Sequence, residues 1–285
     1  MRTILVPTDF SPQAANALDA ACQLSGKLGA TIHLVYVLEF PMTDEETVVT
    51  HVAVLPVEYL RKIKRESEEH LREVAAAKQQ DGLTITYEVR VGNPYRSINN
   101  ALLAKEADLV VMGSKGASGS KEILLGSNAE RMVRFAHCPV LVIKDKVDLS
   151  KIKNIVYATA LLDEESVVTK ALSKLQTAFE AQLHVVRINT ISNFLDDPYV
   201  MDMLQKFAKD HHLKDYTLNT FSDIGEEEGI IHFAKQKGAE LIALATHGRR
   251  GILHLLEGSL AEDIVNHAKF PILTMSLRKH KTRKK

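Results

Sequence analysis

Three glycines and a serine between residues 113 and 127 have the spacing of a loop that could bind phosphate. Gly113 ends an apolar run, Gly116 follows after two residues, and Gly126 and Ser127 come nine residues later, before an apolar repeat at helical spacing. Glycine lets backbone N–H groups approach phosphate oxygens closely, and a helix N-terminus adds unpaired donors and a positive dipole end. Residues 109–143 therefore predict a strand, an anion-binding loop, a helix and a second strand.

The same residues also have a purely structural interpretation. Ser127 and Glu130 have the spacing of a capping box, in which a serine cap stabilises a helix by about 0.5 to 2 kcal/mol without any ligand. Gly113 and Gly116 could serve only a tight turn. The spacing matches neither G-x-G-x-x-G nor G-x-x-x-x-G-K-[ST], so dinucleotide-binding and P-loop sites are disfavoured. Spacing alone leaves phosphate binding and helix capping open.

The spacing G-x2-G-x9-G-[ST] resembles the ATP-binding signature of the universal stress protein family. Gly113, Gly116, Gly126 and Ser127 match it at every position, and KEILLGS before the helix and CPVLVI after it are also similar to that family. The resemblance implies an α/β fold, a five-stranded sheet of order 3-2-1-4-5, and ATP or AMP as the bound cofactor. It leaves open whether Mg²⁺ accompanies the triphosphate.

The rest of the first half supplies the elements of such a fold. Apolar runs predict strands at residues 3–6, 32–37 and 83–91, and helical spacing predicts helices that start at Ser11 and Pro12, near residue 60 and near Pro94. Near-continuous apolar strands separated by helices indicate a doubly wound parallel sheet with helices on both faces. Residues 40–55 lack clean periodicity, and we expect a loop or lid there.

The second half of the chain repeats the first. Gly116, Gly126, Ser127 and Glu130 recur 132 residues later as Gly248, Gly258, Ser259 and Glu262, and residues 4–9 resemble residues 155–160. We therefore predict two tandem Rossmann-like universal stress protein domains with five-stranded parallel sheets. The predicted domains span residues 1–146 and 151–278, and a basic tail follows at 279–285.

The second copy departs from the pattern at two positions. Ala160 replaces Asp9, and Ala245 replaces Gly113. Loss of the carboxylate would remove a charge-assisted hydrogen bond of about 1.5 to 3 kcal/mol. This difference favours a mainly structural second domain that pairs with the first as a pseudo-dimer within the chain. Whether the whole chain forms a homodimer stays open.

The predicted site lies where the first and fourth strands end, at the topological switch point of the sheet. By the resemblance, the nucleoside faces the turn after the first strand, the adenine lies against two apolar residues, and the glycine loop holds ribose and phosphates. In that order these are Pro7, Thr8 and Asp9; Val37 and Met112; and Gly113, Gly116, Gly126, Ser127 and Asn128. The alternative for Asp9 is a turn or helix-cap residue beside Ser11.

Composition and other motifs exclude several classes of function. The 36 basic residues are balanced by 36 acidic ones, which argues against stable nucleic-acid binding. No apolar stretch approaches the ~20 residues of a membrane span. Two cysteines are too few for a disulfide framework, so we expect a reducing, cytoplasmic location. The 12 histidines lack paired ligand spacing, and the adjacent His211 and His212, expected on a helix, cannot both face one metal.

Two functions follow. The first is an ATP-binding regulatory protein of the stress response, in which the nucleotide orders the loop at 117–125 and alters a surface recognised by an unidentified protein partner. Only Asp9 is placed as a base that could activate water, so at most slow ATP hydrolysis or phosphorylation of a loop serine such as Ser118 or Ser120 is expected. The second is a nucleotide-independent scaffold, or a stress protein that binds another small ligand.

Overall fold

The structure is a computed structural model that describes residues 1–39, 57–79, 82–116, 125–246 and 259–277. Four features singled out above lie outside the described residues. These are the expected loop or lid at 40–55, residues 117–124 of the glycine loop, the second-copy loop with Gly248 and Gly258, and the basic tail.

The first half alternates strands and helices in the predicted order. Its elements are β1 (Thr3–Thr8), α1 (Pro12–Leu28), β2 (Thr31–Leu38), α2 (Val57–Gln79), β3 (Ile85–Val91), α3 (Pro94–Ala104), β4 (Leu109–Gly113), α4 (Ser127–Phe135) and β5 (Val140–Ile143). Helix α1 begins as predicted, because the Ser11 hydroxyl accepts the Ala14 N–H at 3.2 Å and Pro12 occupies the first turn. It ends at Gly29, whose φ of 63° lies in the left-handed region.

The second half repeats this order after a short connection. Its elements are η1 (Leu149–Lys151), β6 (Asn154–Ala158), η2 (Asp163–Glu165), α5 (Ser166–Phe179), β7 (Gln182–Asn189), α6 (Asp197–Asp210), β8 (Tyr216–Ser222), α7 (Glu226–Gln236), β9 (Leu241–Thr246), α8 (Ser259–His267) and β10 (Ile272–Ser276). The expectation that His211 and His212 lie on a helix is wrong. Helix α6 ends at Asp210, and His212 has a φ of 52°, which no right-handed helix continues through.

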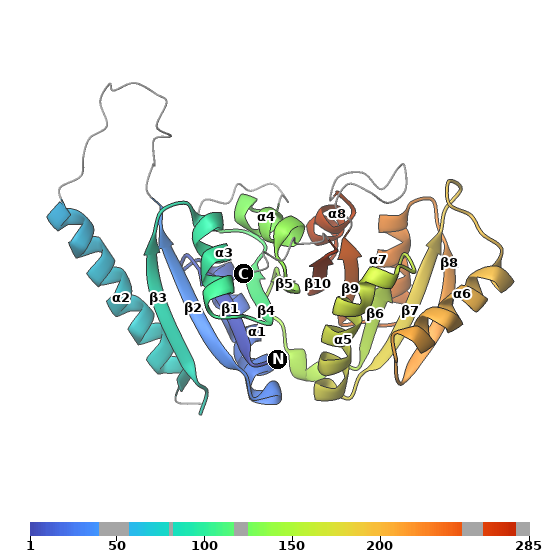
Figure 1. Cartoon of the computed structure of the whole chain (residues 1–285), viewed down its shortest axis with the longest axis horizontal. Helices are drawn as coiled ribbons and strands as arrows, with labels where there is room; N and C mark the ends of the chain where they lie inside the picture. The colour runs from blue at the N-terminus through green and yellow to red at the C-terminus, as the bar shows by residue number, and fades with distance from the viewer. Residues whose placement is uncertain (40–56, 80–81, 117–124, 247–258, 278–285) are drawn as a thin grey trace, which may run out of the picture.

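The ten strands of the described residues form one sheet of order β3-β2-β1-β4-β5-β10-β9-β6-β7-β8. Each half supplies five parallel strands in the predicted order 3-2-1-4-5. The halves join where β5 and β10 pair antiparallel, with Leu141 opposite Leu273. Figure 1 shows the halves side by side along the long axis, with β5 and β10 in the middle.

Helices cover both faces of the sheet. Apolar residues of α1, α2, α5 and α6 pack on one face with alternate strand residues such as Ile4 and Val111. Apolar residues of α3, α4, α7 and α8 pack on the other face with the intervening residues such as Leu5 and Val110. Strands buried on both sides are what the continuous apolar runs predicted. Among the described residues, no helix combines the length and apolar character needed to cross a bilayer.

Candidate functional site

A cavity of about 360 Å³ opens at the carboxyl ends of β1, β2 and β4, where the connections leave the sheet in opposite directions. The N-termini of α3 and α4 complete its wall. Its lining includes all ten residues singled out from the sequence: Pro7, Thr8, Asp9, Val37, Met112, Gly113, Gly116, Gly126, Ser127 and Asn128. The fold thus brings together residues that are more than 100 positions apart in the chain.

The turn after β1 holds Asp9 beside the glycine loop. Asp9 Oδ1 accepts the Ser11 N–H at 3.0 Å, so one carboxylate oxygen stabilises the turn, as in the alternative interpretation of Asp9. Its other oxygen faces the loop, because a Cβ built on Gly116 would lie 2.5 Å from Asp9 Oδ2. The carboxylate therefore stands between the β1 turn and Gly116. A larger residue at position 116 would have to displace it.

The backbone conformation of this turn belongs to the fold. Phe10 has a φ of 62°, which is uncommon for a residue with a side chain, and its N–H donates to the Thr8 hydroxyl at 3.1 Å. In the second half Leu161 has a φ of 64° and donates in the same way to Thr159 at 2.8 Å. Because both halves share the turn, its geometry does not depend on Asp9.

The two described ends of the glycine loop are tied to each other and to the sheet. The Ser114 N–H donates to the Ile143 carbonyl at 3.0 Å, and the Ser114 carbonyl accepts the Gly126 N–H at 2.8 Å. These bonds place the first turn of α4 over the end of β4. A helix N-terminus carries N–H groups without intrahelical partners, so this turn can donate to an anion in the cavity.

The capping box proposed for Ser127 and Glu130 is wrong. Gly126 is the N-cap residue of α4, its backbone is extended, and no side chain caps it. Ser127 is instead the first residue of the helix and is exposed. Glu130 pairs with Arg134 at 3.3 Å instead of reaching back to the cap.

The glycines of the loop differ in the space that is available for a Cβ atom. A Cβ on Gly113 would lie 2.9 Å from the backbone of Gln13, so close packing of α1 on β4 requires this glycine with or without a ligand. A Cβ on Gly126 would touch the Ser114 carbonyl at 3.4 Å, which is an ordinary contact. Packing within the fold therefore does not require glycine at position 126.

Further residues that were not among the predicted site residues complete the cavity. They are Ala14, Val35, Tyr36, Glu39, Pro94, Ile98, Ser114, Lys115 and Ala129. Ser114 and Lys115 occupy the two variable positions between Gly113 and Gly116, so the motif itself could have pointed to them. Ile98 gave no such signal, because only the packing of α3 against β2 brings it to the cavity.

In the second half, the carboxylate near the turn after β6 is Glu165, and it is buried within the fold. Glu165 is fully buried and accepts the N–H groups of Ala160 at 3.2 Å and Leu162 at 3.1 Å. It also accepts the hydroxyls of Thr159 and Tyr157. Burial raises the pKa of Glu165 above its ordinary value, although these donors oppose the shift. No carboxylate replaces Asp9 at the turn itself, where Ala160 stands.

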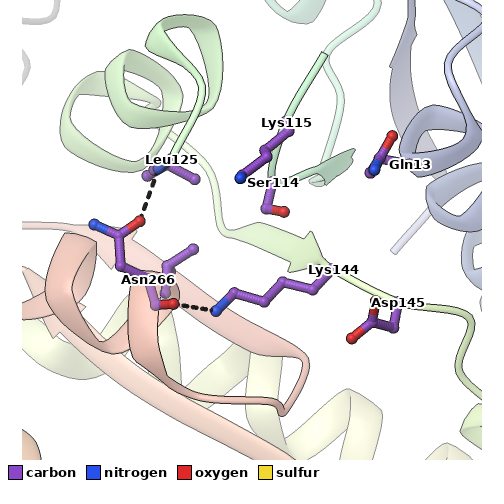
Figure 2. A pocket seen from close by; sticks show the side chains of 8 residues that line it. Gln13, Ser114, Lys115, Leu125, Lys144, Asp145 and Asn266 are labelled. Carbon is purple, nitrogen blue, oxygen red and sulfur yellow. Dashed lines mark hydrogen bonds between the residues drawn. The ribbon is translucent and has the colours of Figure 1, made fainter. Parts of the chain in front are cut away.

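A smaller cavity of about 210 Å³ lies where the two halves meet. It shares Ser114 and Lys115 with the first cavity and adds Lys144 from the end of β5 and Asn266 from α8. Figure 2 shows these residues around it, with Leu125 and Asn266 joined by one hydrogen bond and Lys144 and Asn266 by another. Among the described residues, no group of three or more His, Cys, Asp or Glu side chains is arranged to hold a metal ion.

Comparison with known proteins gives one family for both halves. A model of the universal stress protein family matches residues 1–144 and again residues 151–275. Universal stress protein MJ0531 of Methanocaldococcus jannaschii is 34% identical over 148 residues, which are 50% of this chain and 82% of that protein. Universal stress protein Slr1230 of Synechocystis is 24% identical over 297 residues, which cover 96% of this chain and 99% of that protein.

A solved structure shares the fold over both halves. The crystal structure of a universal stress protein from Archaeoglobus fulgidus superposes with a TM-score of 0.76 and covers 97% of this chain and 98% of that chain. The sequence identity is 19%, so this likeness concerns the fold.

Proposed function

The chain belongs to the universal stress protein family in a tandem form, and from this premise we propose that its first half binds an adenine nucleotide. ATP is the proposed ligand, with AMP as the alternative. The proposed role is regulatory: occupancy of the site changes a surface that a protein partner recognises. The second half acts mainly as a structural partner of the first. A cytoplasmic location remains part of this proposal.

One observation carries the proposal. The four signature positions and Asp9 come from three separate segments of the chain, and all of them line one cavity at the switch point of the sheet. The lining of the cavity combines apolar side chains, among them Val37, Met112 and Ile98, with the N-terminus of α4. A flat apolar base and an anionic phosphate tail need such a pair of environments.

The chemistry of the lining supports binding more than turnover. Lys115 lines the cavity from within the glycine loop, where its charge favours phosphate. Asp9 and Glu39 are the acidic side chains among the lining residues, and Asp9 Oδ1 is engaged by Ser11. Hydrolysis would need a base aligned with a water at the terminal phosphate, as well as a phosphate cradle. We therefore propose slow turnover or none.

A second function keeps one specific observation in its favour. The Gly126 N–H already donates to Ser114, and Asp9 Oδ1 already accepts from Ser11, so the site holds its shape through internal hydrogen bonds. A scaffold with an unrelated small ligand would show the same feature. The experiment below separates the two functions.

Mass spectrometry of the natively purified chain should detect co-purifying ATP or AMP. The Asp9→Ala variant should lower ATP affinity by roughly ten- to a hundredfold, because it removes a charge-assisted hydrogen bond of about 1.5 to 3 kcal/mol. Asp19→Ala is the matched control, since Asp19 lies on α1 and pairs with Lys78 at 2.7 Å. Unchanged ATP affinity in Asp9→Ala, with no nucleotide in the purified protein, would favour the scaffold.

A further inference from the structure

The residue before the glycine of the phosphate loop is held by the other half of the molecule. The Leu125 N–H donates to Asn266 Oδ1 at 2.7 Å, and 141 residues separate the two in the chain. Leu125 directly precedes Gly126, the N-cap residue of α4. The start of α4 therefore takes part of its position from α8.

Two consecutive N–H groups fix the path of the chain into α4. Leu125 donates to Asn266 in the second half, and Gly126 donates to the Ser114 carbonyl in the first half. No side chain caps α4 at Gly126, and these two bonds fix the backbone just before the first helical residue. One anchor comes from the loop itself and the other from outside the domain.

Asn266 is itself held in place by the first half. Lys144 Nζ, just after β5, donates to the Asn266 backbone carbonyl at 2.6 Å and to the Ala268 carbonyl at 2.7 Å. These carbonyls belong to the end of α8, where a cation also interacts favourably with the helix dipole. Figure 2 shows the sequence of contacts from Lys144 through Asn266 to Leu125. Asn266 is thus fixed through its backbone and is free to use its side-chain oxygen on Leu125.

The two copies are chemically different at this position. The residue 132 positions before Asn266 is Arg134, which carries hydrogen-bond donors and no acceptor. An arginine cannot accept a backbone N–H, and Arg134 instead pairs with Glu130 and Glu262, each at 3.3 Å. The side-chain acceptor for the backbone N–H before the helix therefore comes from the second half, which contacts the complete motif of the first half.

We propose that Asn266 is a positioning residue for the nucleotide site of the first half. It holds the Leu125–Gly126 backbone so that the α4 N-terminus faces the phosphates. The second half thereby contributes to a site whose sequence motif lies wholly within the first half. This inference rests on the proposed function. It gives the degenerate copy a defined part in binding beyond general support.

ATP titration calorimetry on the full chain tests the proposal with three variants. Asn266→Ala should weaken ATP binding by about three- to tenfold, the effect of one lost hydrogen bond. Asn266→Asp keeps an oxygen for the Leu125 N–H and should bind ATP more tightly than Asn266→Ala. Gln23→Ala is the control: Gln23 of α1 donates to the Val147 carbonyl at 3.0 Å and accepts the Leu149 N–H at 2.7 Å, so its loss loosens the connection between the halves without removing a hydrogen bond of Asn266. Gln23→Ala should leave ATP affinity within about twofold of the wild-type value.

Hydrogen exchange without ligand supplies a second measurement. Amide exchange at Leu125 should accelerate in Asn266→Ala and stay unchanged in Gln23→Ala. Wild-type affinity in Asn266→Ala, or an equal loss in Asn266→Ala and Gln23→Ala, would overturn the positioning role while the proposed function stands. Failure of the wild-type chain to bind ATP would overturn the proposed function itself, and this inference with it.

Discussion

At the scale of single residues, Glu262 on α8 is the carboxylate that the contact between the halves perturbs most clearly. Burial raises its pKa to about 7, and Glu130 and Asp263 add to the shift while Arg134 opposes it. Arg134 lies between Glu262 and Glu130, so one guanidinium serves a carboxylate from each half. Two acids that share one base favour the protonated form of the more buried acid.

The stability of the chain should therefore depend on pH through Glu262. Its folded-state pKa lies above the ordinary value of 4.5, so the folded chain binds more protons than the unfolded chain between pH 4.5 and about 7. The contribution of Glu262 to stability is full below this window and is lost as pH rises through it. Glu262→Gln should be more stable than wild type at pH 8 by on the order of 1 kcal/mol and equal to it near pH 4.5.

Urea unfolding of both proteins from pH 4.5 to pH 8 checks this expectation. Comparison with wild type cancels the other titrating groups. A constant difference in unfolding free energy across the range would show that the pKa of Glu262 is the same in the folded and unfolded chains, so that Arg134 fully offsets burial.

At the scale of elements, local sequence determines where α4 lies, and tertiary packing determines the residue at which it begins. Apolar spacing located α4, and the strand before it, from sequence alone. The cap was misplaced by one residue, because serine at 127 and glutamate at 130 satisfy the capping pattern while Gly126 takes the N-cap conformation. A serine caps a helix only from the N-cap position. Gly126 occupies this position in α4, and the tertiary hydrogen bonds of Gly126 to Ser114 and of Leu125 to Asn266 hold the backbone in this register.

Two serines at helix starts should consequently differ when each is changed to alanine. Ser11→Ala removes the bond to the Ala14 N–H and should lower the unfolding free energy by about 1 kcal/mol. Ser127→Ala removes no capping bond and should lower it by less than about 0.5 kcal/mol. Thermal and urea unfolding without nucleotide provide the comparison. Equal losses in the two variants would mean that Ser127 caps α4 in solution.

The same elements show what sequence could predict of the site. The ten residues singled out from the sequence all line the cavity, since each lies at or just past the carboxyl end of a strand or at the start of α4, and those ends converge in a doubly wound sheet. Ile98 and Glu39 could not be predicted, because their place depends on how α3 and the end of β2 pack. Asn266 could not be predicted either, since only the pairing of β5 with β10 brings α8 to Leu125.

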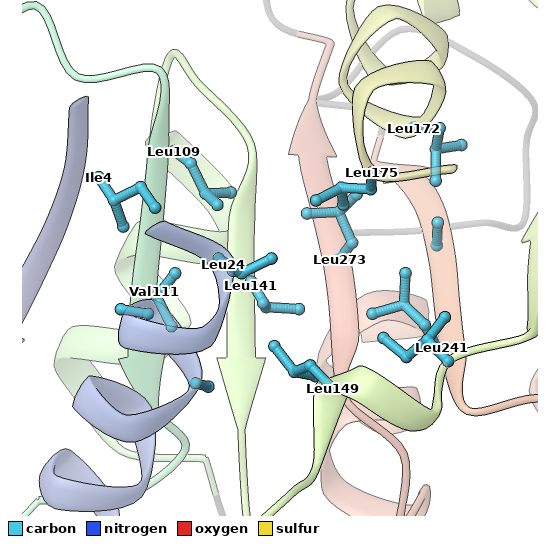
Figure 3. Packing of buried hydrophobic residues seen from close by; sticks show 14 of the residues in the cluster. Ile4, Leu24, Leu109, Val111, Leu141, Leu149, Leu172, Leu175, Leu241 and Leu273 are labelled. Carbon is cyan, nitrogen blue, oxygen red and sulfur yellow. The ribbon is translucent and has the colours of Figure 1, made fainter. Parts of the chain in front are cut away.

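At the scale of the whole molecule, one core runs through the join between the halves. Leu141 of β5 and Leu273 of β10 face each other in the sheet, and Leu24, Leu149 and Leu175 pack around them from α1, the connection and α5 (Figure 3). All five are at most 2% exposed. A join that is this apolar makes the two halves a single packed unit, which agrees with the proposed pairing within the chain.

The asymmetry between the halves leads to the central claim of one nucleotide site per chain. The first half has Asp9, Gly113 and an anchored α4, whereas the second has Ala160 and Ala245 at the matching positions and uses Glu165 internally. The helix after β6 also starts later, because η2 occupies the place of the first turn of α1. Both differences remove features that a phosphate-binding crevice would use.

Titration calorimetry of ATP into the full chain tests this claim most directly, with Gly126→Val and its second-copy counterpart Gly258→Val as the matched pair. The wild-type chain should bind one ATP. Gly126→Val should abolish binding at a modest stability cost, because its φ of −64° suits any residue and its Cβ would meet the Ser114, Lys115 and Gly116 backbone at no less than 3.4 Å. Gly258→Val should leave the single site intact. Two equivalent sites in the wild-type chain, or ATP binding that survives Gly126→Val and is lost in Gly258→Val, would contradict the account.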